Sequence, residues 1–183
     1  IILIAGDTHT GKTNLAQKLL EHYKIPYVSI DLSEAVILTS LLKVTMIFDG
    51  KALAGRQGND QNLYRKQPEL IVEGCYIPWD WKKDFTEEEG KSISYLCLIF
   101  SRAYLEKNFN LIRKHENVIE QGNATSSLED MISCNERNFQ NCLEYHLGHI
   151  DIDDKYEVFP QAVASIEKQL KEGSDFKARR NSL

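Results

Sequence analysis

The sequence predicts an α/β fold built on a parallel sheet, and three observations support this prediction. The chain opens with IILIA at 1–5, an apolar and largely β-branched run that is typical of a parallel strand covered on both faces. A loop bounded by two glycines follows it directly. Four further strand-like runs then recur among helical patterns, as in β–α–β units. The length of 183 residues fits one domain with a substantial core.

The loop at 6–13, GDTHTGKT, matches the phosphate-loop pattern G-x-x-x-x-G-K-[ST] at every fixed position. Its backbone N–H groups can surround a polyphosphate, and the helix predicted behind it, with Leu15 and Leu19 on one face, adds the positive end of its dipole. We expect Lys12 to reach the β- and γ-phosphates and the Thr13 hydroxyl to ligate Mg²⁺. A chance turn is the alternative, which the flanking strand and helix disfavour. The predicted nucleotide-binding residues are Gly6, Thr8, His9, Thr10, Gly11, Lys12 and Thr13.

Composition narrows the class of protein. A net charge of -5 argues against nucleic acid as the main partner, and no apolar run is long enough to span a bilayer. Because Ile1 already belongs to the first strand, we expect no signal peptide. The four cysteines form no C-x-x-C pair, so we expect reduced thiols in a cytoplasmic protein, with small core residues as their simplest role.

The second strand is predicted at 26–31, PYVSID, where Pro26 marks its start. Asp31 falls at its carboxyl end, the edge at which open α/β sheets bind ligands. Its carboxylate could accept a proton from a substrate hydroxyl or hold Mg²⁺ through water, so Asp31 is a candidate catalytic residue. The alternative is a helix N-cap, a role that Ser33 could fill instead.

The stretch from 33 to 67 is harder to interpret. Residues 33–48 fit a helix slightly better than a strand, and 49–62, rich in Gly, Asn, Asp and Gln, indicate a loop. Arg56, Arg65 and Lys66 could clamp a phosphorylated acceptor, or they could simply be solvated.

A third strand is predicted at 70–74, LIVEG. An apolar run that ends in an acid is the pattern of the second acidic motif of phosphate-loop proteins, so we expect Glu73 to support Mg²⁺ through water. The aromatic segment that follows contains Trp79 and Trp81, which could line a pocket or cover the sheet.

The remaining strands and helices are predicted from apolar runs and from the helical spacing of apolar residues. Ser126 and Glu129 form a potential capping box, and a last helix is expected to end at Gly173 before a polar, basic tail at 174–183 that we expect to be disordered. We therefore expect a single domain over 1–173. The elements predicted in this half are a strand at 94–100, a helix at 101–116, a polar break at 117–126, a helix to about 146, a strand at 149–152 and a helix at 161–171.

The order of these elements, with the stretches 6–13, 26–32 and 70–81, resembles the small phosphate-loop kinases. The closest likeness is to bacterial adenylate-kinase-like proteins of the nucleoside and nucleotide kinase group, and weaker likeness extends over 104–119 and 151–157. This resemblance implies a three-layer α/β/α P-loop NTPase fold with a five-stranded parallel sheet in the order 2-3-1-4-5. It also implies ATP with Mg²⁺ as phosphoryl donor and a small acceptor, a nucleotide or nucleoside first of all.

The same resemblance assigns roles to residues. Lys12 and Thr13 would hold phosphate and Mg²⁺, Asp31 would contact the acceptor, and Glu73 would support a metal-bound water. The break at 117–126 would be a lid that closes over the acceptor. Segment 153–156 would lie near the adenine.

Two departures from that family pattern affect the prediction. No arginine stands between Asp31 and Arg56, and the expected lid at 117–126 has no basic residue. Because charge on the transferred phosphoryl group must still be stabilised, we expect Arg137 to do so, with Arg102 as the reserve candidate. Segment 33–67 diverges most, so the acceptor itself is not predicted.

Two functions therefore stay open from sequence. The first is an ATP-dependent kinase of a small acceptor. The second is an ATP-binding regulatory ATPase or a kinase relic with weak transfer, which the lid without arginine would explain. A GTPase is disfavoured, because the guanine-reading run N-K-x-D is absent from the sequence.

Overall fold

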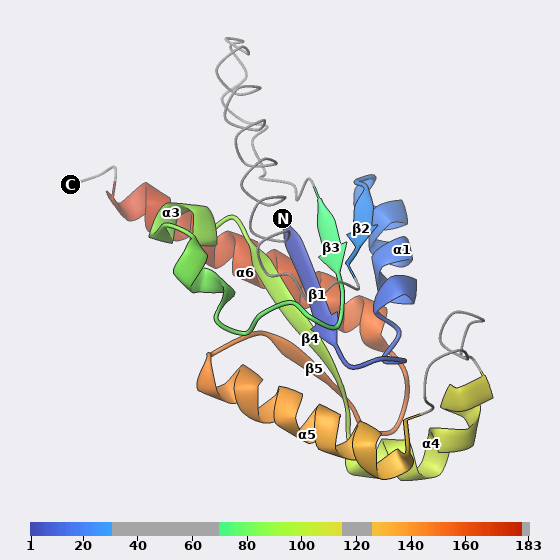
Figure 1. Cartoon of the computed structure of the whole chain (residues 1–183). Helices are drawn as coiled ribbons and strands as arrows, with labels where there is room; N and C mark the ends of the chain where they lie inside the picture. Colours follow the sequence, from blue (N-terminus) through green and yellow to red (C-terminus); the bar gives the residue numbers. More distant parts are fainter. Residues whose placement is uncertain (31–69, 115–125, 181–183) are drawn as a thin grey trace.

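A computed structural model describes residues 1–30, 70–114 and 126–180, with 173–180 described as backbone only. The five predicted strands are present and all pair in parallel, in the order β2-β3-β1-β4-β5 (Figure 1). This confirms the fold class and the strand order expected from the sequence. The strands are β1 (Ile2–Gly6), β2 (Tyr27–Ser29), β3 (Ile71–Glu73), β4 (Ser94–Phe100) and β5 (His149–Ile152).

Strand β1 lies at the centre of the sheet and is buried along its whole length. Its residue Ile4 is in register with Glu73 of β3 on one side and with Leu96 of β4 on the other. The chain leaves β1 towards β2 and β3, and later returns to the opposite side for β4 and β5. Ligands of open α/β sheets bind at the carboxyl edge where the strand order reverses in this way, and β1 ends there.

Helices cover both faces of the sheet and complete three layers. Ile2, Ile4 and Leu98 point to a core shared with α1, α4 and α6, whereas Leu3 and Cys97 point to a second core that includes the 3₁₀ turn η1 and part of α5. Alternate residues of each strand face opposite layers because side chains alternate along a strand. The helical elements are α1 (Lys12–Tyr23), η1 (Trp81–Asp84), α3 (Glu87–Gly90), α4 (Arg102–Lys114), α5 (Leu128–Glu144) and α6 (Val158–Arg180).

Two predicted helix boundaries are wrong. The capping box of α5 starts at Ser127 rather than Ser126: the Ser127 hydroxyl accepts from the backbone N–H of Asp130, and the Asp130 carboxylate accepts from Ser127. Helix α6 does not end at Gly173 but continues to Arg180, so 174–180 are helical and not a disordered tail. A single glycine costs a helix interior only about 1 kcal/mol, and the residues Lys177, Ala178, Arg179 and Arg180 after it favour helix.

The sequence left open whether Trp79 and Trp81 line a pocket or cover the sheet. Trp81 is 3% exposed, and its ring is stacked on Tyr95 of β4 at 6.4 Å between centroids. Trp79 packs partly buried against the same core. Both therefore cover the sheet, and Trp81 in addition lines a hollow of about 520 Å³, so it has both of the roles considered. Among the cysteines, all of which are free, Cys97 and Cys142 are buried as expected of small core residues.

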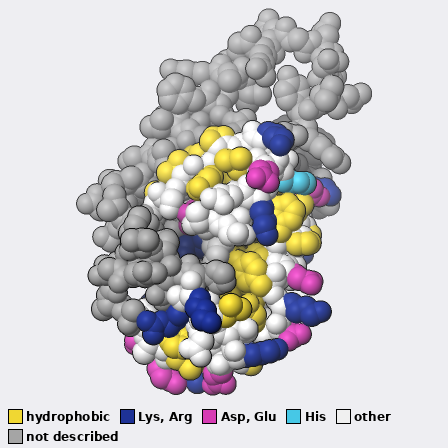
Figure 2. All heavy atoms as spheres, turned by 90° about the vertical axis from the view of Figure 1, so that its right-hand side faces the viewer, with side chains coloured by type: hydrophobic (Ala, Val, Ile, Leu, Met, Phe, Trp, Pro, Cys, Tyr) yellow, Lys and Arg dark blue, Asp and Glu magenta, His cyan; other side chains and the backbone are white. Residues whose placement is uncertain are grey.

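Several sequence predictions lie outside the described residues: the helix at 33–48, the loop at 49–62, the acid Asp31 and nearly all of the expected lid at 117–126. No helix within the described ranges combines the length and the apolar character needed to cross a membrane. Figure 2 views the molecule from the side of α1, where basic and acidic side chains are interspersed with apolar ones.

Candidate active site

The phosphate loop leaves β1 through an unusual backbone. Gly6 has φ 144° and Gly11 has φ 83°, both in a range that glycine adopts readily, and His9 between them is left-handed at φ 68°. Gly11 is the N-cap of α1 and provides no side-chain cap, so the first N–H groups of the helix have no side-chain acceptor there. The loop thus presents backbone donors and a helix N-terminus at one place, as anion binding requires.

The carbonyl of Asp7 holds the loop together. It accepts hydrogen bonds from the Thr10 hydroxyl at 2.8 Å and from the Lys12 ammonium at 2.8 Å. Lys12 is only 7% exposed and therefore lies folded over the loop. The Thr8 hydroxyl lies 3.7 Å from the sulfur of Cys75, which follows β3.

Thr13 and Glu73 meet beside the loop, although 60 residues separate them in the chain. The Thr13 hydroxyl donates to Oε1 of Glu73 at 2.9 Å, and Glu73 is 1% exposed at the end of β3. A hydroxyl and a carboxylate are oxygen ligands of the kind that Mg²⁺ prefers, so this donor set fits the ion. The described residues contain no group of three or more His, Cys, Asp or Glu placed to hold a metal. Mg²⁺ here would therefore depend on phosphate and water ligands as well.

Asp7 and Asn135 form a second polar contact that the sequence did not single out. Asn135 of α5 is 1% exposed; its Oδ1 accepts from the Phe100 N–H at 2.8 Å, and its Nδ2 donates to the Met131 carbonyl and, at 3.5 Å, to Asp7. Burial raises the pKa of Asp7, and a hydrogen bond from the Thr8 backbone and nearby positive charges oppose that rise. Asn135 thus ties α5, the end of β4 and the loop together.

The two candidate arginines are placed differently. Arg137 lies exposed on α5, close enough for its charge to act on Asp7, and its guanidinium lies 3.6 Å from the Cys134 sulfur. Arg102 of α4 is ion-paired with Glu136 at 3.1 Å. Arg137 thus lies exposed on the helix that also carries Asn135, while Arg102 is held between α4 and α5.

The segment between β5 and α6 borders the loop on its other side. The Tyr156 hydroxyl donates to the carbonyl of Thr10 at 2.9 Å, and burial raises its pKa to about 12. A hollow of about 150 Å³ lies between this segment and the start of α1. Its walls are Asn14, Leu15, Lys18, Tyr156, Glu157, Val158, Phe159 and Pro160.

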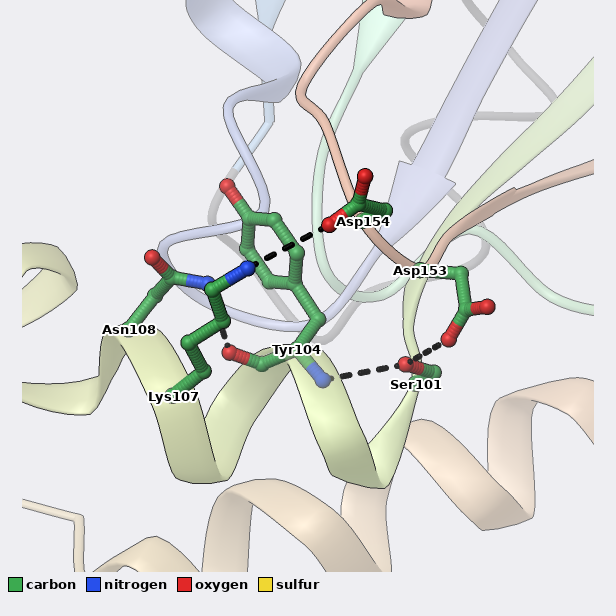
Figure 3. A network of polar contacts seen from close by, with 6 residues as sticks. All are labelled: Ser101, Tyr104, Lys107, Asn108, Asp153 and Asp154. Carbon is green, nitrogen blue, oxygen red and sulfur yellow. Dashed lines mark hydrogen bonds and ion pairs between the residues drawn. The ribbon is translucent and has the colours of Figure 1, made fainter.

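The same segment is anchored to α4 (Figure 3). The Ser101 hydroxyl donates to Asp153 at 2.7 Å and accepts from the Tyr104 N–H at 3.1 Å, so it caps α4 while holding the segment. Lys107 pairs with Asp154 at 3.3 Å, an exposed contact that contributes little by itself.

Sequence motifs identified part of this site. Glu73 and the phosphate loop were found from strand-plus-motif patterns. Asp7 sits in a variable position of the motif, Asn135 in an ordinary helix, and Tyr156 in an acidic turn. An acid inside a phosphate-binding loop was a signal that could have drawn attention to Asp7. Tyr156 lies in the segment 153–156 that the resemblance placed near the adenine, although its bond to the loop was not predicted, whereas Asn135 carries no local signal.

A parallel sheet in the order β2-β3-β1-β4-β5, with a phosphate loop after its central strand, defines a three-layer P-loop NTPase fold. This architecture agrees with the resemblance to small phosphate-loop kinases. No protein-family model and no curated protein matches the chain.

Several solved structures with a related arrangement are described as kinases. A gluconokinase from Sinorhizobium meliloti is 14% identical over 96% of this chain and 95% of its own, with a TM-score of 0.47. Deoxyadenosine kinase from M. mycoides is 12% identical over 100% of both chains, with a TM-score of 0.40. Shikimate kinase from Bacteroides thetaiotaomicron is 10% identical over 100% of this chain and 98% of its own, with a TM-score of 0.37. At these values the argument for function rests on the geometry of the site.

Proposed function

We propose that this protein is a kinase that transfers the terminal phosphoryl group of ATP to a small acceptor, with nucleotides and nucleosides as the first candidates. The observation that carries the proposal is the meeting of Lys12, Thr13 and Glu73 at the carboxyl edge of β1 and β3. A P-loop lysine, a hydroxyl suited to Mg²⁺ and a buried carboxylate that bonds it form the donor half of a phosphoryl-transfer site.

The residues around the phosphate loop have the following roles in this proposal. The N–H groups of the loop and of the first turn of α1 bind the β- and γ-phosphates, and Lys12 turns from the Asp7 carbonyl to the phosphate oxygens. Thr13 would ligate Mg²⁺ directly, and Glu73 would orient a water on the ion. When bound, the ion supplies charge neutralisation between the β- and γ-phosphates.

Three residues are candidates for the acceptor half of the site. Arg137, whose charge already acts on the phosphate loop, is proposed to stabilise the transferred phosphoryl group. Arg102 remains the reserve candidate, although it would have to leave Glu136 first. Asp31, outside the described residues, is proposed to contact the acceptor hydroxyl.

The base of the nucleotide is proposed to lie against segment 153–156 and the neighbouring hollow. That hollow opens beside Asn14, directly after the threonine proposed to bind Mg²⁺, and has Tyr156 and Pro160 among its walls.

We further propose a small-molecule partner, rather than nucleic acid or a membrane. The four free cysteines suit a reducing compartment such as the cytoplasm.

The test is ADP production from Mg·ATP with and without a panel of acceptors that includes nucleoside monophosphates, nucleosides, sugar acids and amino-alcohols. Acceptor-dependent ADP release, absent from a Lys12→Met variant, would support the kinase. Turnover that is flat across the panel would contradict it and would favour the regulatory ATPase instead.

A further inference from the structure

Tyr156 contacts the phosphate loop at a point where the direction of one peptide group matters. Its hydroxyl donates to the Thr10 carbonyl at 2.9 Å. In a trans peptide the carbonyl of one residue and the N–H of the next point in opposite directions, and the described backbone contains no cis peptide. Fixing the Thr10 carbonyl therefore fixes the Gly11 N–H so that it points away from Tyr156.

Gly11 allows this contact to be close. A Cβ built on Gly11 would clash with the Tyr156 hydroxyl and would lie 2.8 Å from the ring carbon that carries it. The phenol thus occupies the space that any other residue at position 11 would need. The motif glycine serves two purposes here: it adopts φ 83°, and it admits the tyrosine.

Tyr156 is itself held from elsewhere. Its ring contacts Phe100 at 6.5 Å between centroids, and its segment is fastened to the first turn of α4 by the bond between Ser101 and Asp153 (Figure 3). The residue is 37% exposed as a whole, but its hydroxyl end is engaged by the Thr10 carbonyl. The hydroxyl is consequently a neutral donor on a support that does not depend on the loop.

We propose that Tyr156 is a positioning residue of the phosphate site, which turns the Thr10–Gly11 peptide so that the Gly11 N–H faces the phosphates of a bound nucleotide. An anion cradle needs its N–H groups inward and its carbonyls outward, and the Tyr156 hydroxyl provides the outward partner for one carbonyl. The inference rests on the nucleotide-binding part of the proposed function and is independent of phosphoryl transfer.

The position of the Tyr156 ring allows an effect on phosphate binding to be distinguished from an effect on binding of the base. The ring is a wall of the hollow beside α1, whereas the hydroxyl bonds the loop. Loss of the hydroxyl alone should therefore weaken binding of phosphates and leave binding of the base unchanged.

The experiment compares wild type with Tyr156→Phe by isothermal titration, using inorganic tripolyphosphate, Mg·ATP and adenosine as probes. We expect tripolyphosphate and ATP to bind about 3- to 10-fold more weakly to the variant, the size expected for one hydrogen bond. Adenosine should bind within about twofold of wild type on the same reasoning. Tyr145→Phe, a change at an exposed tyrosine at the end of α5, is the matched control and should alter none of the three.

A second variant keeps the inference testable if Tyr156→Phe is less stable than wild type. Ser101→Ala removes the hydroxyl that holds Asp153, which loosens the support of Tyr156, and should weaken tripolyphosphate binding while thermal unfolding still shows a folded protein. Unchanged tripolyphosphate affinity in Tyr156→Phe would overturn the inference, and so would an equal loss of affinity for adenosine.

Tight ATP binding by wild type without transfer to any acceptor would refute the kinase alone and leave the role of Tyr156 intact. Failure of wild type to bind either ATP or tripolyphosphate would overturn both.

Discussion

The contact between Thr13 and Glu73 gives a quantitative prediction about stability. Thr13→Val preserves the shape of the side chain but removes the hydroxyl that donates to Glu73 at 2.9 Å. A hydrogen bond to a charged group contributes about 1.5–3 kcal/mol. Glu73 is 1% exposed but Thr13 itself is exposed, so water can partly replace the lost donor, and we expect a cost in the lower half of that range.

A double-mutant cycle isolates this contribution. Glu73→Leu removes the carboxylate, and the double variant removes both partners of the hydrogen bond, so that neither is left unpaired. The free energy of unfolding, measured by urea titration, should therefore fall less in the double variant than the sum of the single variants, by about 1.5–3 kcal/mol. Thr13→Ser keeps the hydroxyl and is the control, because its hydrogen bond to Glu73 and therefore its free energy of unfolding should stay close to those of wild type. Additivity within about 0.5 kcal/mol would refute the account of this pair.

The same variants test the proposed metal role. The ratio of ATP affinity with Mg²⁺ to ATP affinity with a chelator should exceed one for wild type and for Thr13→Ser, and should approach one for Thr13→Val. A Thr13→Val variant that retains the full Mg²⁺ enhancement would remove Thr13 from the metal site.

Three more variants probe other parts of the site. Lys12→Met removes one positive contact to the phosphates and should reduce ADP release by about 10²–10³-fold with an unchanged circular dichroism spectrum; activity near wild type would exclude Lys12 from catalysis. Asn135→Leu leaves the Phe100 N–H without its 2.8 Å acceptor and should lower the free energy of unfolding by about 1–3 kcal/mol in urea, which a neutral effect would contradict. Because burial raises the pKa of Asp7 above 3.8, the folded chain binds that proton more tightly than the unfolded chain, and stability falls as pH rises through this window. Asp7→Asn should therefore gain in melting temperature relative to wild type between pH 3 and 7, and a pH-independent difference would contradict this assignment.

The sheet could be predicted because each of its strands carries its own signal. The inner strands β1, β3 and β4 are buried on both faces and therefore appear as short apolar runs, and the motif after β1 indicated the helix that follows it. The same logic placed Glu73 beside the loop, since β1 and β3 end at the same edge of the sheet.

Helix boundaries were less predictable because neighbouring residues offered equivalent signals. Ser126 with Glu129 and Ser127 with Asp130 both satisfy the capping pattern, and the structure uses the second pair. At Gly173 the sequence signal for a helix end was real but weak, and the favourable residues after it outweigh it.

Contacts of Asn135 and Tyr156 could not be predicted, because they depend on tertiary packing. Asn135 matters since α5 crosses the end of β4, and Tyr156 matters since the β5–α6 segment folds back onto the phosphate loop. The resemblance singled out the segment 153–156 but gave no reason to expect that Tyr156 bonds the phosphate loop, and Asn135 belongs to no local pattern.

The central claim is that the terminal phosphoryl group of ATP reaches a small acceptor rather than water. The most direct measurement follows ATP labelled in its γ-phosphate through one turnover with the acceptor that best stimulates ADP release. We expect the label in the acceptor, and none of this transfer with Lys12→Met. Label recovered only as inorganic phosphate, at a rate independent of the acceptor, would contradict the claim and identify an ATPase.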